Sequence, residues 1–215
     1  MNVPKQIPCS CKQNASINYS MIHQFTAVNL YRFFCLSLFR DKYYNVRITK
    51  KILAQATGET ESVLKDFNDT FRDLLEIKPY YVENSFCFMT RRNIYHIPPM
   101  DYPQCITLSR KLVRYELEAK VKGYFIQLLL LFKFGNIEMT STKIKKILNI
   151  DKSTFDKYNL KLLMAGLLKY EKKYIRLVEG DLLRPNDYNN QKYISTNSMP
   201  KTILPNFVLN GKSLV

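Results

Sequence analysis

The residues of this chain that are best suited to binding chemistry are lysines, which gather in one stretch of the second half. Between residues 140 and 161 there are six lysines and only two aspartates. Lysine side chains bind phosphate groups, and they also reach the acceptor atoms that guanine presents in the major groove of DNA. The composition of this stretch therefore indicates a polyanionic partner, nucleic acid or an anionic membrane, with charge that serves only solubility as the alternative.

Two short helices are expected to position these lysines. Thr140 or Ser141 is suited to cap the first helix, and Asp151 is suited to cap the second. Asn149 stands where the chain must turn between them, because Asn tolerates a left-handed backbone. The apolar residues of the second helix recur at spacings of three and four, at Phe155, Tyr158, Leu162 and Ala165.

A hairpin is expected directly after this second helix. Gly166 ends the helix, and residues 167–170 and 174–178 have the composition of two strands. The region therefore predicts two helices joined by a tight turn and followed by a hairpin.

The same order of residues occurs earlier in the chain, at an offset of 91 residues and with no gap. Residues 45–49 align with residues 136–140, and Gly58 aligns with Asn149. Apolar helical stretches precede the two copies at residues 30–39 and 121–130. The first copy predicts helices over residues 50–57 and 60–75 and a hairpin over residues 80–90. A self-match at a fixed offset is the mark of a repeated structural unit.

The predicted order of elements is helix, short strand, helix, turn, helix and hairpin. This order resembles the winged helix-turn-helix plan. The predicted fold class is mainly α with small β-hairpins (α+β), built as two tandem winged-helix domains related by the internal repeat. The expected boundaries are an irregular N-terminal arm over residues 1–20, a first domain over 21–100, a second domain over 107–180 and a C-terminal extension over 181–215. By composition the extension is expected to be mobile or extended. If it packs, its own chain is favoured over a second subunit. Its expected anchors are Ile203, Leu204, Phe207 and Val208.

In helix-turn-helix domains the second helix of the motif enters the major groove, and the exposed residues near its N-terminus meet the base edges. The residues expected at base edges are Lys152, Ser153, Asp156, Lys157 and Lys161. The residues expected at the DNA backbone, on the preceding helix and the wing, are Lys143, Lys145, Lys146, Lys172, Lys173 and Arg176.

Charge separates the two copies. The whole chain has a formal net charge of +15, and residues 107–215 hold 20 basic and 9 acidic residues. Residues 59–76 of the first copy instead hold six acidic and two basic residues, and DNA would repel such a helix. We expect this helix to contact protein, with a solvated face that has no partner as the alternative. Its acidic residues are Glu59, Glu61, Asp66, Asp69 and Asp73.

One DNA-reading winged helix behind a diverged, protein-binding one resembles the initiator Rep proteins of plasmids. The resemblance implies a homodimer or a replication-protein partner through the first domain, repeated origin sites as the DNA target, and a helical linker over residues 107–122. It also implies base reading by Lys152, Ser153 and Lys157. Transcription regulation is a close alternative. A second alternative is a scaffold that works through protein contacts, which would require Leu160 and Met164 to be exposed together.

Other functions are not favoured by the sequence. The longest apolar run, residues 124–134, is too short to span a bilayer, and residues 1–20 lack the apolar core of a signal peptide, so we expect a cytoplasmic location and no membrane partner. The two histidines stand apart, and Cys9 and Cys11 lack a second ligand pair for zinc. No phosphate loop or nucleophile motif occurs. We therefore expect no enzyme activity, cofactor, metal or small-molecule substrate.

Overall fold

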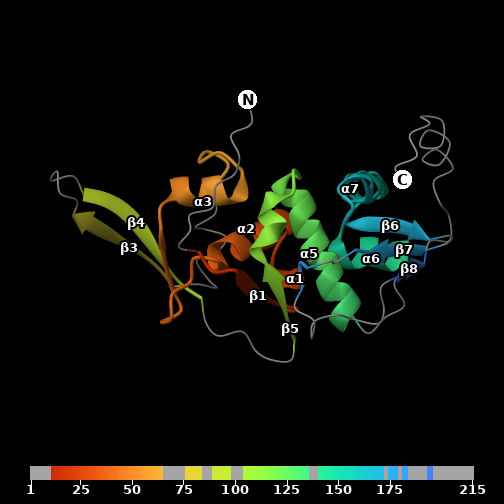
Figure 1. Ribbon diagram of the computed structural model, residues 1–215, viewed down its shortest axis with the longest axis horizontal. Coiled ribbons are helices and arrows are strands. Elements are labelled where there is room, and N and C mark those ends of the chain that lie inside the picture. The colour runs from red at the N-terminus through yellow and green to blue at the C-terminus, as the bar shows by residue number, and fades with distance from the viewer. Residues whose placement is uncertain are drawn as a thin grey trace.

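A computed structural model describes residues 11–64, 76–83, 89–97, 104–135, 140–171, 174–178, 181–183 and 193–195 of the chain. The fold is α+β, with helices and small antiparallel sheets (Figure 1). The helices are α1 (Met21–Gln24), α2 (Ala27–Ser37), α3 (Lys50–Thr57), the 3-10 helix η1 (Arg110–Arg114), α5 (Ala119–Phe134), α6 (Ser141–Leu148) and α7 (Lys152–Met164). The strands are β1 (Asn14–Asn18), β2 (Asn45–Ile48), β3 (Glu76–Glu83), β4 (Met89–His96), β5 (Cys105–Ser109), β6 (Leu168–Glu171), β7 (Tyr174–Leu177) and β8 (Tyr193–Ser195).

Helices α3 and α6 have the same length, the same type of cap and the same type of ending. The hydroxyl of Thr49 accepts a hydrogen bond from the Ile52 amide, and that of Thr140 accepts one from the Lys143 amide. Each helix is eight residues long. Both end at a left-handed residue, Gly58 with φ of 72° and Asn149 with φ of 50°. The helices predicted at these positions are confirmed, and their caps lie 91 residues apart.

Helix α7 begins at the predicted cap. The carboxylate of Asp151 accepts hydrogen bonds from the Thr154 amide at 2.8 Å, the Ser153 hydroxyl at 2.6 Å and the Thr154 hydroxyl at 2.7 Å. The chain leaves the helix through Gly166, whose φ is +73°, and enters the β6–β7 hairpin. The second helix and the hairpin of this region are therefore confirmed.

The two three-stranded sheets are built alike. One has the order β2–β4–β3 and the other β6–β7–β8, so the second strand of each hairpin lies in the middle. Strand β2, which precedes the first hairpin, covers one edge of β4. Strand β8 from the C-terminal extension covers the corresponding edge of β7. These two sheets lie at opposite ends of the molecule (Figure 1).

The centre of the molecule is made by α2 and α5, which pack side by side, and by the antiparallel pair β1–β5. In that pair Ser16 lies opposite Thr107, and Asn14 and Asn18 lie opposite Ser109 and Cys105. Ser16 and Thr107 are 91 residues apart, and their hydroxyl oxygens are 3.3 Å apart. An antiparallel pair centred on two corresponding residues has local two-fold symmetry.

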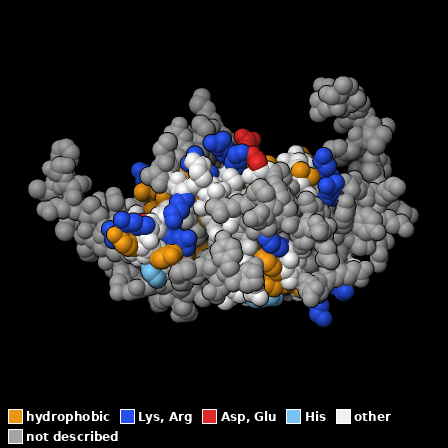
Figure 2. Space-filling model, turned by 60° about the horizontal axis from the view of Figure 1, so that its bottom comes forward, with side chains coloured by type: hydrophobic (Ala, Val, Ile, Leu, Met, Phe, Trp, Pro, Cys, Tyr) orange, Lys and Arg blue, Asp and Glu red, His pale blue; other side chains and the backbone are white. Residues whose placement is uncertain are grey.

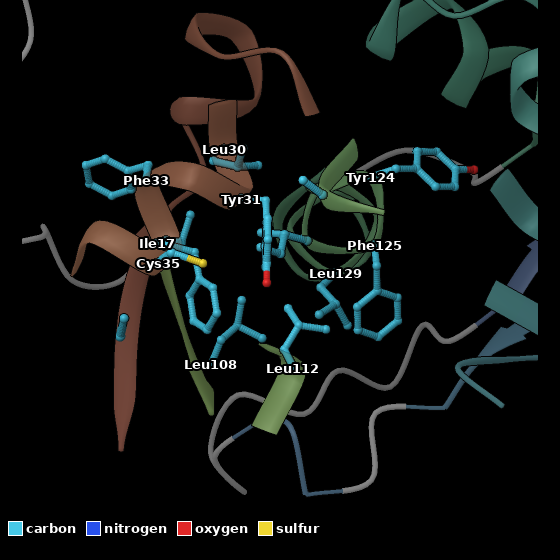
Figure 3. Close-up of a cluster of buried hydrophobic side chains, with 14 of the residues drawn as sticks. Ile17, Leu30, Tyr31, Phe33, Cys35, Leu108, Leu112, Tyr124, Phe125 and Leu129 are labelled. Atoms are coloured by element: carbon cyan, nitrogen blue, oxygen red, sulfur yellow. The ribbon is translucent and has the colours of Figure 1, made fainter. Parts of the chain in front are cut away.

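One cluster of buried apolar side chains extends from β1 and α2 through α5 to α7 and β6. Figure 3 shows its centre, where side chains of β1, α2, β5, η1 and α5 converge around Tyr31 and Leu129. Gly123 allows the backbones of α2 and α5 to approach closely, because a Cβ atom there would lie 1.6 Å from the Ala27 carbonyl oxygen. The apolar stretches predicted as helices therefore form a shared core and not two separate ones.

The structure differs from the sequence predictions in several places. Residues 14–18 of the predicted irregular arm form β1, because the distant strand β5 supplies its hydrogen-bonding partner. The predicted helical linker over residues 107–122 is wrong, since that segment continues β5, forms η1 and is extended at Tyr115 before α5 begins. The first hairpin is longer than predicted, with β3 and β4 starting and ending beyond residues 80–90. The predicted helix over residues 60–75 lies mostly outside the described residues, and the described residues 61–64 form turns.

The described part of the C-terminal extension packs on its own chain. Leu182 and Leu183 are buried, and Leu183 forms a β-bridge with Leu108. Strand β8 pairs with β7. The four predicted anchors, Ile203, Leu204, Phe207 and Val208, lie outside the described residues.

Candidate nucleic-acid interface

The predicted base-contacting residues are carried, with one exception, by the first two turns of α7. Lys152, Ser153 and Lys157 are exposed, and Asp156 is half-buried. Residues four positions apart on a helix share a face, so Ser153 and Lys157 lie together, as do Lys152 and Asp156. The left-handed turn at Asn149 and the Asp151 cap directly precede the helix. The structure therefore brings these four residues to one accessible helix start.

Asp151 is anionic and tied to the helix that it caps. Hydrogen bonds from the hydroxyls of Ser153 and Thr154 hold the pKa of its carboxyl well below the ordinary value. The Ser153 hydroxyl donates its proton to this carboxylate and keeps only its acceptor capacity. A base contact by Ser153 would therefore be to a donor, such as an exocyclic amino group.

Lys161 lies differently from the other predicted base-contacting residues. Its amine forms an ion pair with Glu118, the residue that precedes α5, and Lys120 approaches the same carboxylate at 3.1 Å. The Lys161 and Lys120 amines lower the pKa of Glu118. Because Lys161 is engaged with the start of α5, the structure does not place it with the residues at the start of α7.

The predicted backbone contacts lie on α6, which precedes α7, and on the hairpin that follows it. Lys143 and Lys146 on α6 are exposed, whereas Lys145 is half-buried with its amine 6.0 Å from the centre of the Phe155 ring. Arg176 on β7 is half-buried. The wing residues Lys172 and Lys173 lie outside the described residues.

Lys169 is a basic residue of this region that the sequence prediction missed. It is exposed on β6 and lies directly opposite Arg176 of β7 in the strand register. Two basic side chains at directly opposite positions of a hairpin point to the same face, so both are suited to meet one stretch of phosphate backbone. The alternation of residues along the predicted strand was the signal that could have placed Lys169 on an exposed face. Its position opposite Arg176 follows only from the hairpin register.

Of the five acidic residues predicted to contact a partner in the first copy, only Glu59 and Glu61 lie within the described residues. Glu59, predicted to contact a partner, forms a two-point ion pair with Arg32 of α2, with N–O distances of 2.9 and 2.7 Å. The Glu59 side chain is only 12% exposed and that of Arg32 only 9%, so Glu59 is engaged within the fold and presents little contact surface. Glu61 is exposed. Asp66, Asp69 and Asp73 lie outside the described residues.

The apolar patch required by the scaffold alternative is present only in part. Met164 is 72% exposed, but Leu160 is half-buried. A pocket of about 430 Å³ lies beside Met164 and is lined also by Leu117, Glu118 and Lys161. Among the described residues, the Lys and Arg side chains on the face shown in Figure 2 form several groups.

Within the described residues, no helix is long and apolar enough to cross a membrane, and no three His, Cys, Asp or Glu side chains are grouped to hold a metal ion. Cys11, Cys35 and Cys105 are buried, and Cys9 lies outside the described residues. Comparisons with protein-family models, curated proteins and solved structures found no match to this chain.

Proposed function

We propose that this chain is a tandem of two winged-helix domains and that the second binds duplex DNA with α7 in the major groove. The observation that carries the proposal is the start of α7, where exposed Lys152 and Lys157 follow a tight turn and a capped helix start. Lys143 and Lys146 on the preceding helix α6 are also exposed and are suited to phosphate contacts. The proposed cellular role is replication initiation of a plasmid or mobile element, or transcription regulation.

The arrangement of the sheets supports the winged-helix part of the proposal. In the first copy a short strand, β2, lies between α2 and α3 and joins the edge of the later hairpin β3–β4. In the second copy α5, α6 and the β6–β7 hairpin follow one another in the order of α2, α3 and the β3–β4 hairpin. Helices α3 and α6 correspond residue by residue at an offset of 91.

A salt series with labelled duplex DNA tests the proposal. Binding is measured by fluorescence anisotropy for the wild type and for Lys152→Glu/Lys157→Glu. We expect affinity to fall steeply with salt, because bound lysines release counterions from DNA. The double substitution should weaken binding by about 100-fold or more, since each base contact contributes on the order of 1–3 kcal/mol.

The matched control is Lys111→Glu/Arg114→Glu, which makes the same change of charge at two exposed residues of η1. We expect this variant to keep most of the wild-type affinity. Equal losses in both variants would mean that only net charge matters, and no binding at low salt would overturn the proposal.

Protein scaffolding is the second candidate, and it is favoured by the exposure of Met164 beside the pocket. It predicts no duplex binding and the loss of a protein partner in Met164→Asp. The anisotropy experiment separates the two candidates, because a scaffold would not respond to Lys152→Glu/Lys157→Glu.

A further inference from the structure

The turn between α2 and β2 carries two exposed aromatic side chains among basic ones. Tyr43 is 65% exposed and Tyr44 is 38% exposed, and none of the other Phe and Tyr side chains that the structure describes is as open to solvent. We propose that this turn, residues 40–44, is a second nucleic-acid site, which binds single strands by stacking unpaired bases on Tyr43. It lies in the half of the molecule that does not carry α7 (Figure 1).

Hydrogen bonds hold the backbone of this turn in a fixed conformation. The Asp41 carboxylate accepts hydrogen bonds from the amides of Tyr43 at 2.8 Å and Asn45 at 2.9 Å. The Ile97 amide donates to the Tyr44 carbonyl at 2.8 Å. Tyr44 has a φ of 66°, which is unusual for a bulky residue. A backbone that is already ordered loses little freedom when a base stacks on a ring that it carries.

Cations accompany both rings. The Lys42 amine lies 4.9 Å from the centre of the Tyr43 ring, and the Arg40 guanidinium lies 5.2 Å from that of Tyr44. Residues 40–51 contain five basic residues and one acidic residue, Asp41, whose carboxylate is occupied by backbone amides. Basic side chains interleaved with exposed aromatic ones are the composition of single-strand binding surfaces.

The second copy offers an internal comparison. At the offset of 91 residues, Lys133 and Phe134 correspond to Lys42 and Tyr43, and the Lys133 amine lies 5.4 Å from the Phe134 ring centre. Phe134 is half-buried, and its ring packs against Tyr19 at 5.8 Å. The same pair is therefore covered in the second copy and open in the first, where a base can reach the ring.

Fluorescence anisotropy with a labelled oligothymidine tests the site in the full-length protein. Tyr43→Ala should weaken binding about tenfold, because stacking on an aromatic side chain is lost. Tyr43→Phe should bind like the wild type, since the ring remains. Val63→Ala, which shortens another exposed apolar side chain, is the matched control and should also bind like the wild type. Circular dichroism melting confirms that each variant is folded.

The Lys152→Glu/Lys157→Glu variant separates this proposal from the duplex proposal, because it should lose duplex binding and keep oligothymidine binding. Equal oligothymidine affinity of Tyr43→Ala and the wild type would overturn the single-strand site. So would Tyr43-dependent binding to phosphatidylserine vesicles in the absence of oligothymidine binding, which would assign the turn to a membrane surface.

Discussion

Lys122 of α5 is fully buried. Its amine donates hydrogen bonds to the Val113 carbonyl at 2.8 Å and to the Tyr31 hydroxyl of α2 at 3.3 Å. A buried amine is tolerated only when such acceptors are present. Burial in turn raises the pKa of Tyr31 well above its ordinary value, so this hydroxyl stays protonated. The polar pair therefore ties α2 to both η1 and α5 inside an otherwise apolar core.

We predict that Tyr31→Phe lowers the free energy of unfolding by about 1–2 kcal/mol, because Lys122 loses an acceptor. The raised pKa also has a pH consequence. The unfolded chain ionises Tyr31 near pH 10, so the wild type should lose stability as the pH rises above that value, and Tyr31→Phe should lose less. Urea denaturation at about pH 7 and about pH 11 measures both effects, and Tyr43→Phe, at an exposed position, is the control.

The turns at the ends of α3 and α6 show how single elements are specified. Both helices end at a left-handed residue, but one uses Gly58 and the other Asn149. Asn adopts this conformation at some cost, and glycine adopts it without a Cβ penalty. Substitutions at these two positions therefore measure the cost of a left-handed residue at the end of each helix.

We predict that Asn149→Gly raises the free energy of unfolding by up to about 1 kcal/mol, while Asn149→Ala and Gly58→Ala each lower it by about 1 kcal/mol. Thermal denaturation of the three variants measures this. A loss of stability in Asn149→Gly would show that the Asn149 side chain itself stabilises the turn.

The contact between α2 and α5 should tolerate an added methyl group less well than the helix-ending turns do. Gly123→Ala would place a Cβ atom 1.6 Å from the Ala27 carbonyl oxygen, so the helices must separate. We predict a loss of about 3 kcal/mol or more. Gly166→Ala is the comparison, because a Cβ there meets nothing within 4 Å and the cost comes only from the left-handed backbone, about 1–2 kcal/mol. Similar losses in chemical denaturation would contradict this.

Local features of these elements were predictable from the sequence, and distant pairings were not. Thr49, Thr140 and Asp151 cap helices through amides three positions away, so their roles follow from short-range patterns. The β1–β5 pair and the Arg32–Glu59 ion pair join residues far apart in the chain. Neither polar nor apolar periodicity indicates which distant segment is the partner, so the strand in the arm and the ion pair of Glu59 were both missed.

At the scale of the whole molecule, the buried cluster joins both halves of the chain. We predict that they unfold as one cooperative unit. In hydrogen exchange, amides of α2 and α5 should share the highest protection, and Leu30→Ala should lower the opening free energy of both helices equally. Protection lost in α2 alone would show that the halves unfold independently.

The contact between Tyr31 and Lys122 is one that two identical chains could not make across a symmetry axis. The two residues are 91 apart, the separation that also relates Ser16 and Thr107 in the β1–β5 pair, and their polar atoms are 3.3 Å apart. In a homodimer each axial residue must meet its own copy, which would set Lys against Lys or Tyr against Tyr. A single polypeptide is not bound by that restriction, and the core of this protein holds a complementary donor and acceptor at these two positions.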